Sequence, residues 1–205
     1  MPANQRPSQS PPSQPAVPPM SLLLIVAISL LSWLMMMVVH EAGHVFHAKL
    51  SGGLVTKVVL HPLAISRTDV VPNPHPHFVV WGGPIWGCAL PLLILLLSRK
   101  PQSRLHVLLV FFAGFCLIAN GAYLGVGAFY PIGDAAELMR LGTPKSALIG
   151  FGIVSVTSGL LFWNGLGKQF GLGRQGKPVQ PGLVMGVVLA ALLVAAVEAM
   201  LSDRM

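Results

Sequence analysis

Charged side chains are scarce in this chain of 205 residues. Aspartate, glutamate, lysine and arginine make up only 9% of it, against about 25% in a typical soluble protein. Hydrophobic residues make up 54%. A soluble fold would have too few polar side chains to cover its surface, so the composition excludes the soluble class and predicts a membrane protein.

Clustered basic residues are also lacking. The chain has thirteen basic and six acidic residues, a net charge of +7. A nucleic-acid-binding protein of this charge would gather its basic side chains on one face or along one helix. Here they stand in short groups between apolar runs, which is typical of the loops that flank membrane spans. We therefore predict the lipid bilayer as a partner and no nucleic acid.

Cysteine is rare, and repeats at the period of a solenoid are absent. Cys88 and Cys116 lie inside apolar runs, where we expect them to be small buried hydrophobic residues. The length suits one domain. Residues 1–20 are rich in Pro, Ser and Gln, which predicts a disordered tail. Residues 21–205 are predicted to form a single transmembrane domain.

Long apolar runs are what the chain does have. Five of them come near the roughly 20 residues that a spanning helix needs. Inside a bilayer every backbone polar group must be bonded within the protein, which favours helices over an open sheet. We predict a multi-pass integral membrane protein with helices over 21–39 (continuing into the next motif), 78–98, 105–130, 147–165 and 182–201.

The segment between the first two apolar runs differs in composition. LVTKVVL (54–60) and LAISRTDVV (63–71) are rich in β-branched residues, with glycines before them and prolines after them. This pattern predicts two short strands. The fold class is therefore an all-α polytopic membrane protein of about five transmembrane helices, with a small β-hairpin after the first helix.

The first apolar run ends in HEAGH (40–44), an HExxH motif. Residues i and i+4 lie on one face of a helix, so His40 and His44 can bind one zinc ion. Glu41 follows the first ligand and can act as the general base that activates a zinc-bound water. Ionisable residues inside a membrane are costly and mark functional sites. The motif therefore predicts a metal site on a spanning helix.

A catalytic zinc needs a third protein ligand, and few acids are available. Asp134 follows the third apolar run in YPIGDAAEL, where a proline and a glycine interrupt the helix. Broken backbone at membrane depth is tolerated where it lines a cavity, so Asp134 is the predicted ligand. Glu137 is the reserve, and Asp69 is a further alternative. Asp134 could also serve as the N-cap of a helix over 135–141.

Together these motifs resemble the site-2 protease family of intramembrane zinc metalloproteases, and in particular its small bacterial branch. The matching segments are HEAGH, WGGPIWG (81–87) and PIGD (131–134). The resemblance implies three core helices around a buried zinc, with a hairpin that dips into the membrane. It also implies hydrolysis of peptide bonds in or near the transmembrane segments of a membrane-anchored protein, in a bacterial cytoplasmic membrane.

The chain departs from that family pattern in the third motif. Ala128 stands where the family usually carries asparagine, and Gly133 and Ala135 flank the ligand in place of Leu and Gly. Asn120 could supply the missing amide, although a packing amide bonded to a neighbouring helix is the favoured interpretation. Two rival functions follow: a membrane zinc protein that binds partners without cutting them, and a small metal transporter.

His47 lies on the same helix face as the HEAGH histidines. It is either a partner of the site, such as a proton relay, or an interfacial histidine at the helix end.

Overall fold

The computed structural model describes residues 17–63, 65–98 and 103–202. Most of the predicted tail lies outside these residues. In the described part, five helices are long and apolar enough to cross a membrane, which confirms the predicted class of multi-pass integral membrane protein. These helices are α1 (Pro19–Leu50), α2 (Pro76–Leu97), α3 (Arg104–Gly127), α5 (Lys145–Trp163) and α6 (Pro181–Ser202).

The helices begin at residues suited to a helix start. Pro19 and Pro76 stand in the first turns of α1 and α2, where a missing N–H costs nothing. Ser103 caps α3, and its side-chain oxygen accepts from the His106 amide at 3.1 Å. The apolar runs thus set the helix bodies and local signals set their starts.

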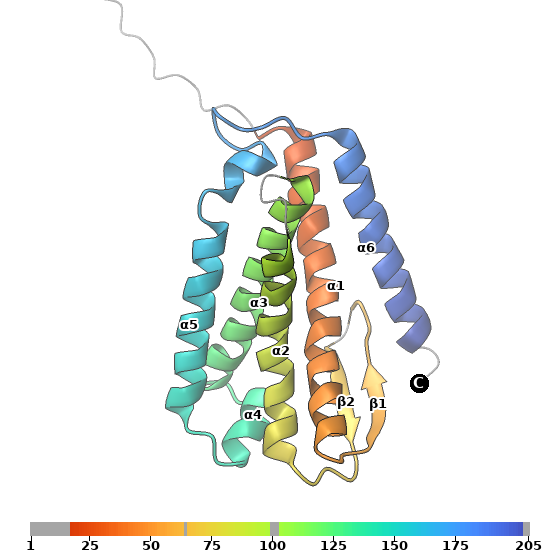
Figure 1. Cartoon of the computed structure of the whole chain (residues 1–205), viewed down its shortest axis with the longest axis vertical. Helices are drawn as coiled ribbons and strands as arrows, with labels where there is room; N and C mark the ends of the chain where they lie inside the picture. Colours follow the sequence, from red (N-terminus) through yellow and green to blue (C-terminus); the bar gives the residue numbers. More distant parts are fainter. Residues whose placement is uncertain (1–16, 64, 99–102, 203–205) are drawn as a thin grey trace, which may run out of the picture.

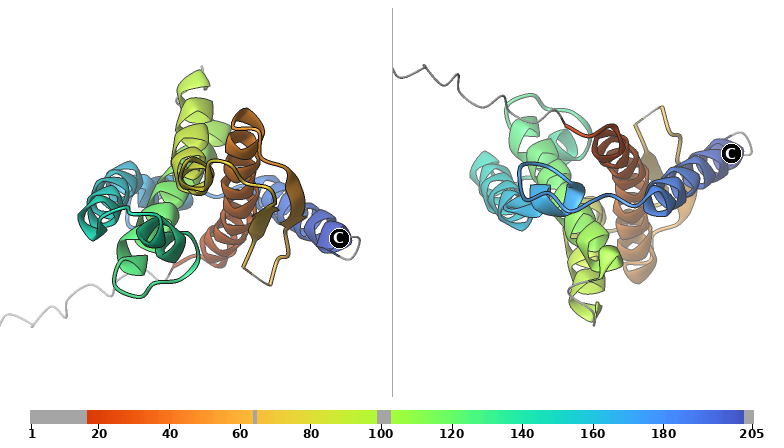
Figure 2. Two further views of the ribbon diagram at one scale, coloured as in Figure 1. Left: turned by 90° about the horizontal axis from the view of Figure 1, so that it is seen from below. Right: turned by 90° about the horizontal axis from the view of Figure 1, so that it is seen from above.

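Three helices form the centre of the bundle. α1, α2 and α3 contact one another, while α5 packs chiefly on α3 and α6 on α1 (Figure 1). A short helix, α4 (Gly133–Arg140), follows α3 and packs against α2 and α3 at the lower end of the bundle. In the view from below, α4 lies beside α2, and the hairpin lies on the far side of α1 (Figure 2).

The predicted hairpin is present after the first helix. Strand β1 (Val55–Val59) pairs antiparallel with β2 (Arg67–Val70), and Val58 stands opposite Thr68. The second strand is shorter than predicted because Pro62 and Leu63 belong to a turn. The hairpin runs along the C-terminal half of α1 (Figure 1).

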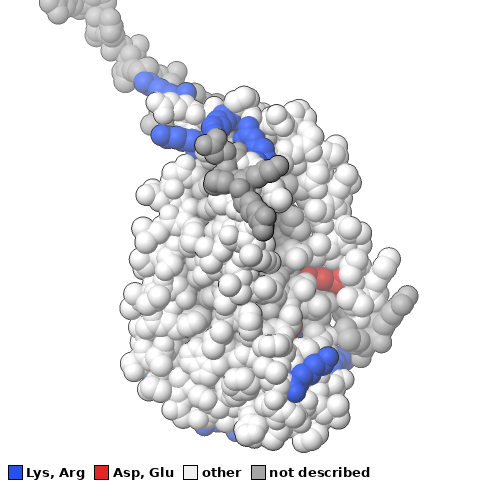
Figure 3. Space-filling view, in the orientation of Figure 1, with Lys and Arg blue, Asp and Glu red and all other residues white. Residues whose placement is uncertain are grey.

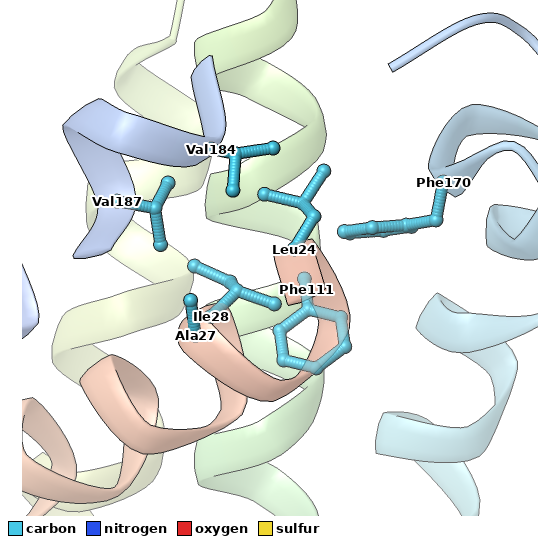
Figure 4. Packing of buried hydrophobic residues seen from close by; sticks show 7 residues of the cluster. All are labelled: Leu24, Ala27, Ile28, Phe111, Phe170, Val184 and Val187. Atoms are coloured by element: carbon cyan, nitrogen blue, oxygen red, sulfur yellow. The ribbon is translucent and has the colours of Figure 1, made fainter. Parts of the chain in front are cut away.

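Apolar packing holds the upper end of the bundle together. Leu24 and Ile28 on α1 meet Phe111 on α3 (Figure 4). Two valines from α6 and a phenylalanine from the 3₁₀ helix η1 (Leu166–Phe170) complete this apolar cluster, whose buried members are Leu24, Ala27, Ile28, Phe111, Phe170, Val184 and Val187. On the face shown in Figure 3, lysines and arginines lie near the two ends of the molecule, and the surface between them is almost free of them.

Candidate metal centre

His40 and His44 project from the C-terminal half of α1 into the bundle. They are 8% and 7% exposed, and their ring centroids are 4.9 Å apart. The spacing of four residues places both rings on one helix face, as predicted. Two buried imidazoles one turn apart are the first half of the site.

Asp134 completes the cluster from the first turn of α4. Its Oδ2 atom lies 2.8 Å from Nε2 of His40 and 3.3 Å from Nε2 of His44. The three ligand atoms all lie within 4.8 Å of one another. A tetrahedral ion with bonds of about 2.0–2.1 Å would separate its ligand atoms by roughly 3.3 Å. The structure therefore brings together the three residues that the sequence singled out.

The other ring nitrogen of each histidine is engaged by a second element. Nδ1 of His44 lies 2.9 Å from the Val79 carbonyl oxygen on α2, and Nδ1 of His40 lies 2.7 Å from Oδ1 of Asn120 on α3. The Asn120 Nδ2 group donates to the Cys116 carbonyl at 2.9 Å, so its oxygen is the atom that faces His40. Both acceptors require the histidines to carry a proton on Nδ1.

This proton arrangement decides what the cluster can bind. The Gly83 amide lies 3.3 Å from Nδ1 of His44, but the shorter contact with the Val79 carbonyl oxygen requires that nitrogen to donate. With Nδ1 protonated, Nε2 of a neutral histidine offers a lone pair. Two such nitrogens and a carboxylate oxygen then point at one another as three acceptors. Only a cation between them, a proton or a metal ion, relieves that repulsion.

Gly83 on α2 leaves the space that an ion would need. A β-carbon built on this residue would lie 2.5 Å from Nε2 of His40 and closer still to Nε2 of His44. Bonds from zinc to histidine nitrogen are about 2.0–2.1 Å long. The position beside both nitrogens is therefore open only because residue 83 has no side chain, and the three ligands fit a metal ion.

The Asp134 carboxyl is in the form that binds metals. Burial alone would raise its pKa, but when the two histidines are protonated, their hydrogen bonds and positive charge lower the pKa of Asp134 well below the usual range. The group is therefore a carboxylate at neutral pH, as a metal ligand must be.

Glu41, the predicted base, is buried at the hairpin side of the same helix, with 3% of its surface exposed. Its two carboxylate oxygens accept hydrogen bonds from the hydroxyls of Ser66, at 2.7 Å, and Thr68, at 2.6 Å. Sequence reasoning missed both partners, which lie 25 and 27 positions away. The only indication of these contacts in the sequence was the presence of two hydroxyl residues in the segment predicted as the second strand (63–71).

A groove between α1 and the hairpin reaches Glu41. It has a volume of about 410 Å³. Apart from Glu41 and Lys49 its walls are apolar, and they comprise Val38, Ala42, Val45, Phe46, Val58 and Leu60. The predicted base thus lies where an apolar groove meets the metal-site helix.

The alternative ligands lie outside the cluster. Glu137 is paired with Arg140 one turn along α4, and Asp69 lies 3.4 Å from Arg67 at the hairpin surface. The expectation that Asp134 could be an N-cap is wrong, because α4 begins at Gly133 and Ile132 occupies the N-cap position.

The structure also shows the contacts of Asn120 and His47, whose roles the sequence left open. Asn120 bonds to a neighbouring helix as expected, but its partner is a predicted metal ligand, which sequence reasoning held to be the less favoured role. His47 donates from Nδ1 to the Phe78 carbonyl at 2.7 Å and accepts from Trp86 at 3.2 Å. Both of its nitrogens are used to join α1 to α2, so His47 serves in packing these two helices together.

Comparisons with known protein families, curated proteins and solved structures found no match to this chain.

Proposed function

We propose that this protein is a zinc-dependent endopeptidase of the membrane, similar to the site-2 proteases. One observation supports the proposal above all: His40, His44 and Asp134 converge within a bundle of candidate spanning helices, and Glu41 directly follows His40 in the sequence. Two histidines and a carboxylate are a common set of zinc ligands in hydrolytic enzymes, with one coordination position left open.

When bound, zinc would act as a Lewis acid toward a water molecule and a peptide carbonyl. The same ligand set also suits iron(II), so the identity of the metal is part of the proposal. The glutamate that follows the first histidine favours zinc, because HExxH places a general base beside a hydrolytic metal.

Glu41 would take the proton of the attacking water and pass it to the departing amine. Its two hydrogen bonds with Ser66 and Thr68 leave further lone pairs, since each carboxylate oxygen can accept more than one hydrogen bond. The hydroxyls therefore hold the carboxylate in one orientation without using up its basic sites.

The substrate would be a transmembrane or membrane-anchored protein. It would reach the site through the apolar groove between α1 and the hairpin, which Glu41 helps to line. In the described sheet β1 pairs with β2 alone, so its other edge can hold an extended peptide by strand addition. A helical segment would have to unwind there before a peptide bond could be cut.

The test is cleavage of a reporter transmembrane peptide in proteoliposomes loaded with zinc. Glu41→Gln should lower the rate by about 10²- to 10⁴-fold while the zinc content stays unchanged. Glu137→Gln is the matched control, because Glu137 is a partly exposed glutamate on α4 outside the cluster. If Glu41→Gln cuts as fast as the wild type, the mechanism is wrong.

One observation favours a second candidate, a membrane zinc protein that binds partners without cutting them. Both carboxylate oxygens of Glu41 are already engaged by the hairpin. That candidate predicts one zinc per chain, binding of reporter peptides and no cleavage. The same proteoliposome experiment separates the two functions.

A further inference from the structure

The third ligand stands on a helix whose start has no cap of its own. Ile132 occupies the N-cap position of α4, and its side chain offers no hydrogen-bond acceptor. The first amides of a helix have no partner within the helix and need one from elsewhere. The Asp134 amide is one of these. Whatever group accepts from it also determines where the Asp134 carboxylate lies.

That group is the hydroxyl of Tyr123, which comes from α3. The Asp134 amide donates to the Tyr123 oxygen at 2.9 Å. The same ring meets His40 edge-on, with centroids 6.0 Å apart. One side chain therefore contacts the backbone of the third ligand and the ring of the first.

Gly133 allows the hydroxyl to come this close. Its φ of +50° is a conformation that favours glycine. A β-carbon at this position would collide with the Tyr123 oxygen and lie 3.1 Å from the ring carbon that carries it. The left-handed glycine and the tyrosine hydroxyl therefore fit each other as a pair.

We propose that Tyr123 is a positioning residue for the metal site, and this inference depends on the proposed metal-binding role of Asp134. Apolar packing of Ala135 and Leu138 against Leu124 holds α4 on α3. Such packing is not directional and does not set the rotation of the first turn. The hydrogen bond to Tyr123 is directional, and it holds the Asp134 backbone where the carboxylate meets both histidines.

The measurement is zinc affinity of the purified full chain in detergent, by competition with a chromophoric chelator. Tyr123→Phe removes only the hydroxyl and should weaken zinc binding about 10- to 100-fold, as loss of an outer partner of a metal ligand does. Tyr130→Phe is the matched control, because Tyr130 is 72% exposed, and it should leave the affinity within twofold of wild type.

A second pair of variants separates positioning from loss of fold. Gly133→Ala should weaken zinc binding because its methyl group displaces the hydroxyl. Adding Tyr123→Phe removes the colliding atom, so the double variant should bind zinc more tightly than the product of the two single losses predicts. Independent losses that simply multiply would overturn the coupling.

The inference is overturned if Tyr123→Phe binds zinc as tightly as wild type. This readout needs no substrate, so wild-type protein that binds zinc without cutting peptides would refute the proposed protease activity and leave the role of Tyr123 standing. Wild-type protein that binds no zinc would overturn both.

Discussion

The two halves of α1 are held in the bundle by different kinds of contact. In the N-terminal half, Leu24 and Ile28 pack into the apolar cluster with Phe111 and the valines of α6 (Figure 4). In the C-terminal half, His40 and His44 donate hydrogen bonds to α3 and α2 at 2.7 and 2.9 Å, and their Nε2 atoms lie 2.8 and 3.3 Å from the Asp134 carboxylate on α4. The packing of the N-terminal half depends on how completely apolar side chains fill the space, and the contacts of the C-terminal half depend on the positions of single atoms.

This difference predicts two kinds of sensitivity. Packed volume tolerates substitutions that conserve size, and its loss costs stability in proportion to the cavity. Directional contacts fail when one atom is removed or added, even where the fold survives. Mutations in the two halves should therefore separate stability from metal binding.

The largest effect is expected from Gly83→Ala on α2. The added methyl would lie against Nε2 of both histidines, in the space an ion needs, so zinc affinity should fall by at least about 1,000-fold, or roughly 4 kcal/mol. Chelator competition measures the affinity. Gly150→Ala in α5 is the control, because a β-carbon there meets nothing within 4 Å, and it should bind zinc normally. Normal zinc binding by Gly83→Ala would show that the metal lies elsewhere.

The next effect should appear in stability and not in metal binding. Leu24 is 2% exposed, so Leu24→Ala leaves a cavity and should lower the free energy of unfolding by about 3 kcal/mol. Leu22→Ala, at a side chain 57% exposed on the same helix, should change it by less than about 0.5 kcal/mol. Unfolding in detergent measures both. Loss of zinc from folded Leu24→Ala would contradict the separation of the two halves.

A smaller effect is expected from Asn120→Ala. Removing the amide leaves Nδ1 of His40 without its acceptor, so zinc affinity should fall about 10- to 100-fold. Asn164→Ala provides the comparison, since Asn164 lies exposed after the end of α5. Equal zinc affinity in the two variants would mean that Asn120 only packs.

The sequence predicts the helices well and their contacts poorly, for a physical reason. A spanning helix is apolar toward lipid and apolar toward its neighbours, so hydropathy locates the span but does not tell which face is packed. The hairpin after α1 was predictable because its segment is enriched in β-branched residues and lies between two apolar helices. Its second strand was predicted too long because Pro62 and Leu63 turn the chain.

The site likewise has parts that a local sequence pattern predicts and parts that depend on contacts between helices. The approach of His40 to His44 is predictable because residues four apart lie about one helical turn apart on the same face. Asp134 follows from a broken helix and a shortage of other acids. The partners Asn120 and Gly83 belong to other helices, 80 and 39 or more positions away from the histidines they meet, and no local pattern encodes such contacts.

The most direct test is the zinc content of the purified chain and of two variants, by elemental analysis. The wild type should hold one zinc per chain, and Asp134→Ala should hold little or none, because a ligand is lost. Glu137→Ala removes the neighbouring acid that pairs with Arg140 and should keep the full content. Full zinc content in Asp134→Ala, or loss of zinc in Glu137→Ala alone, would contradict the assignment of His40, His44 and Asp134 as the metal ligands.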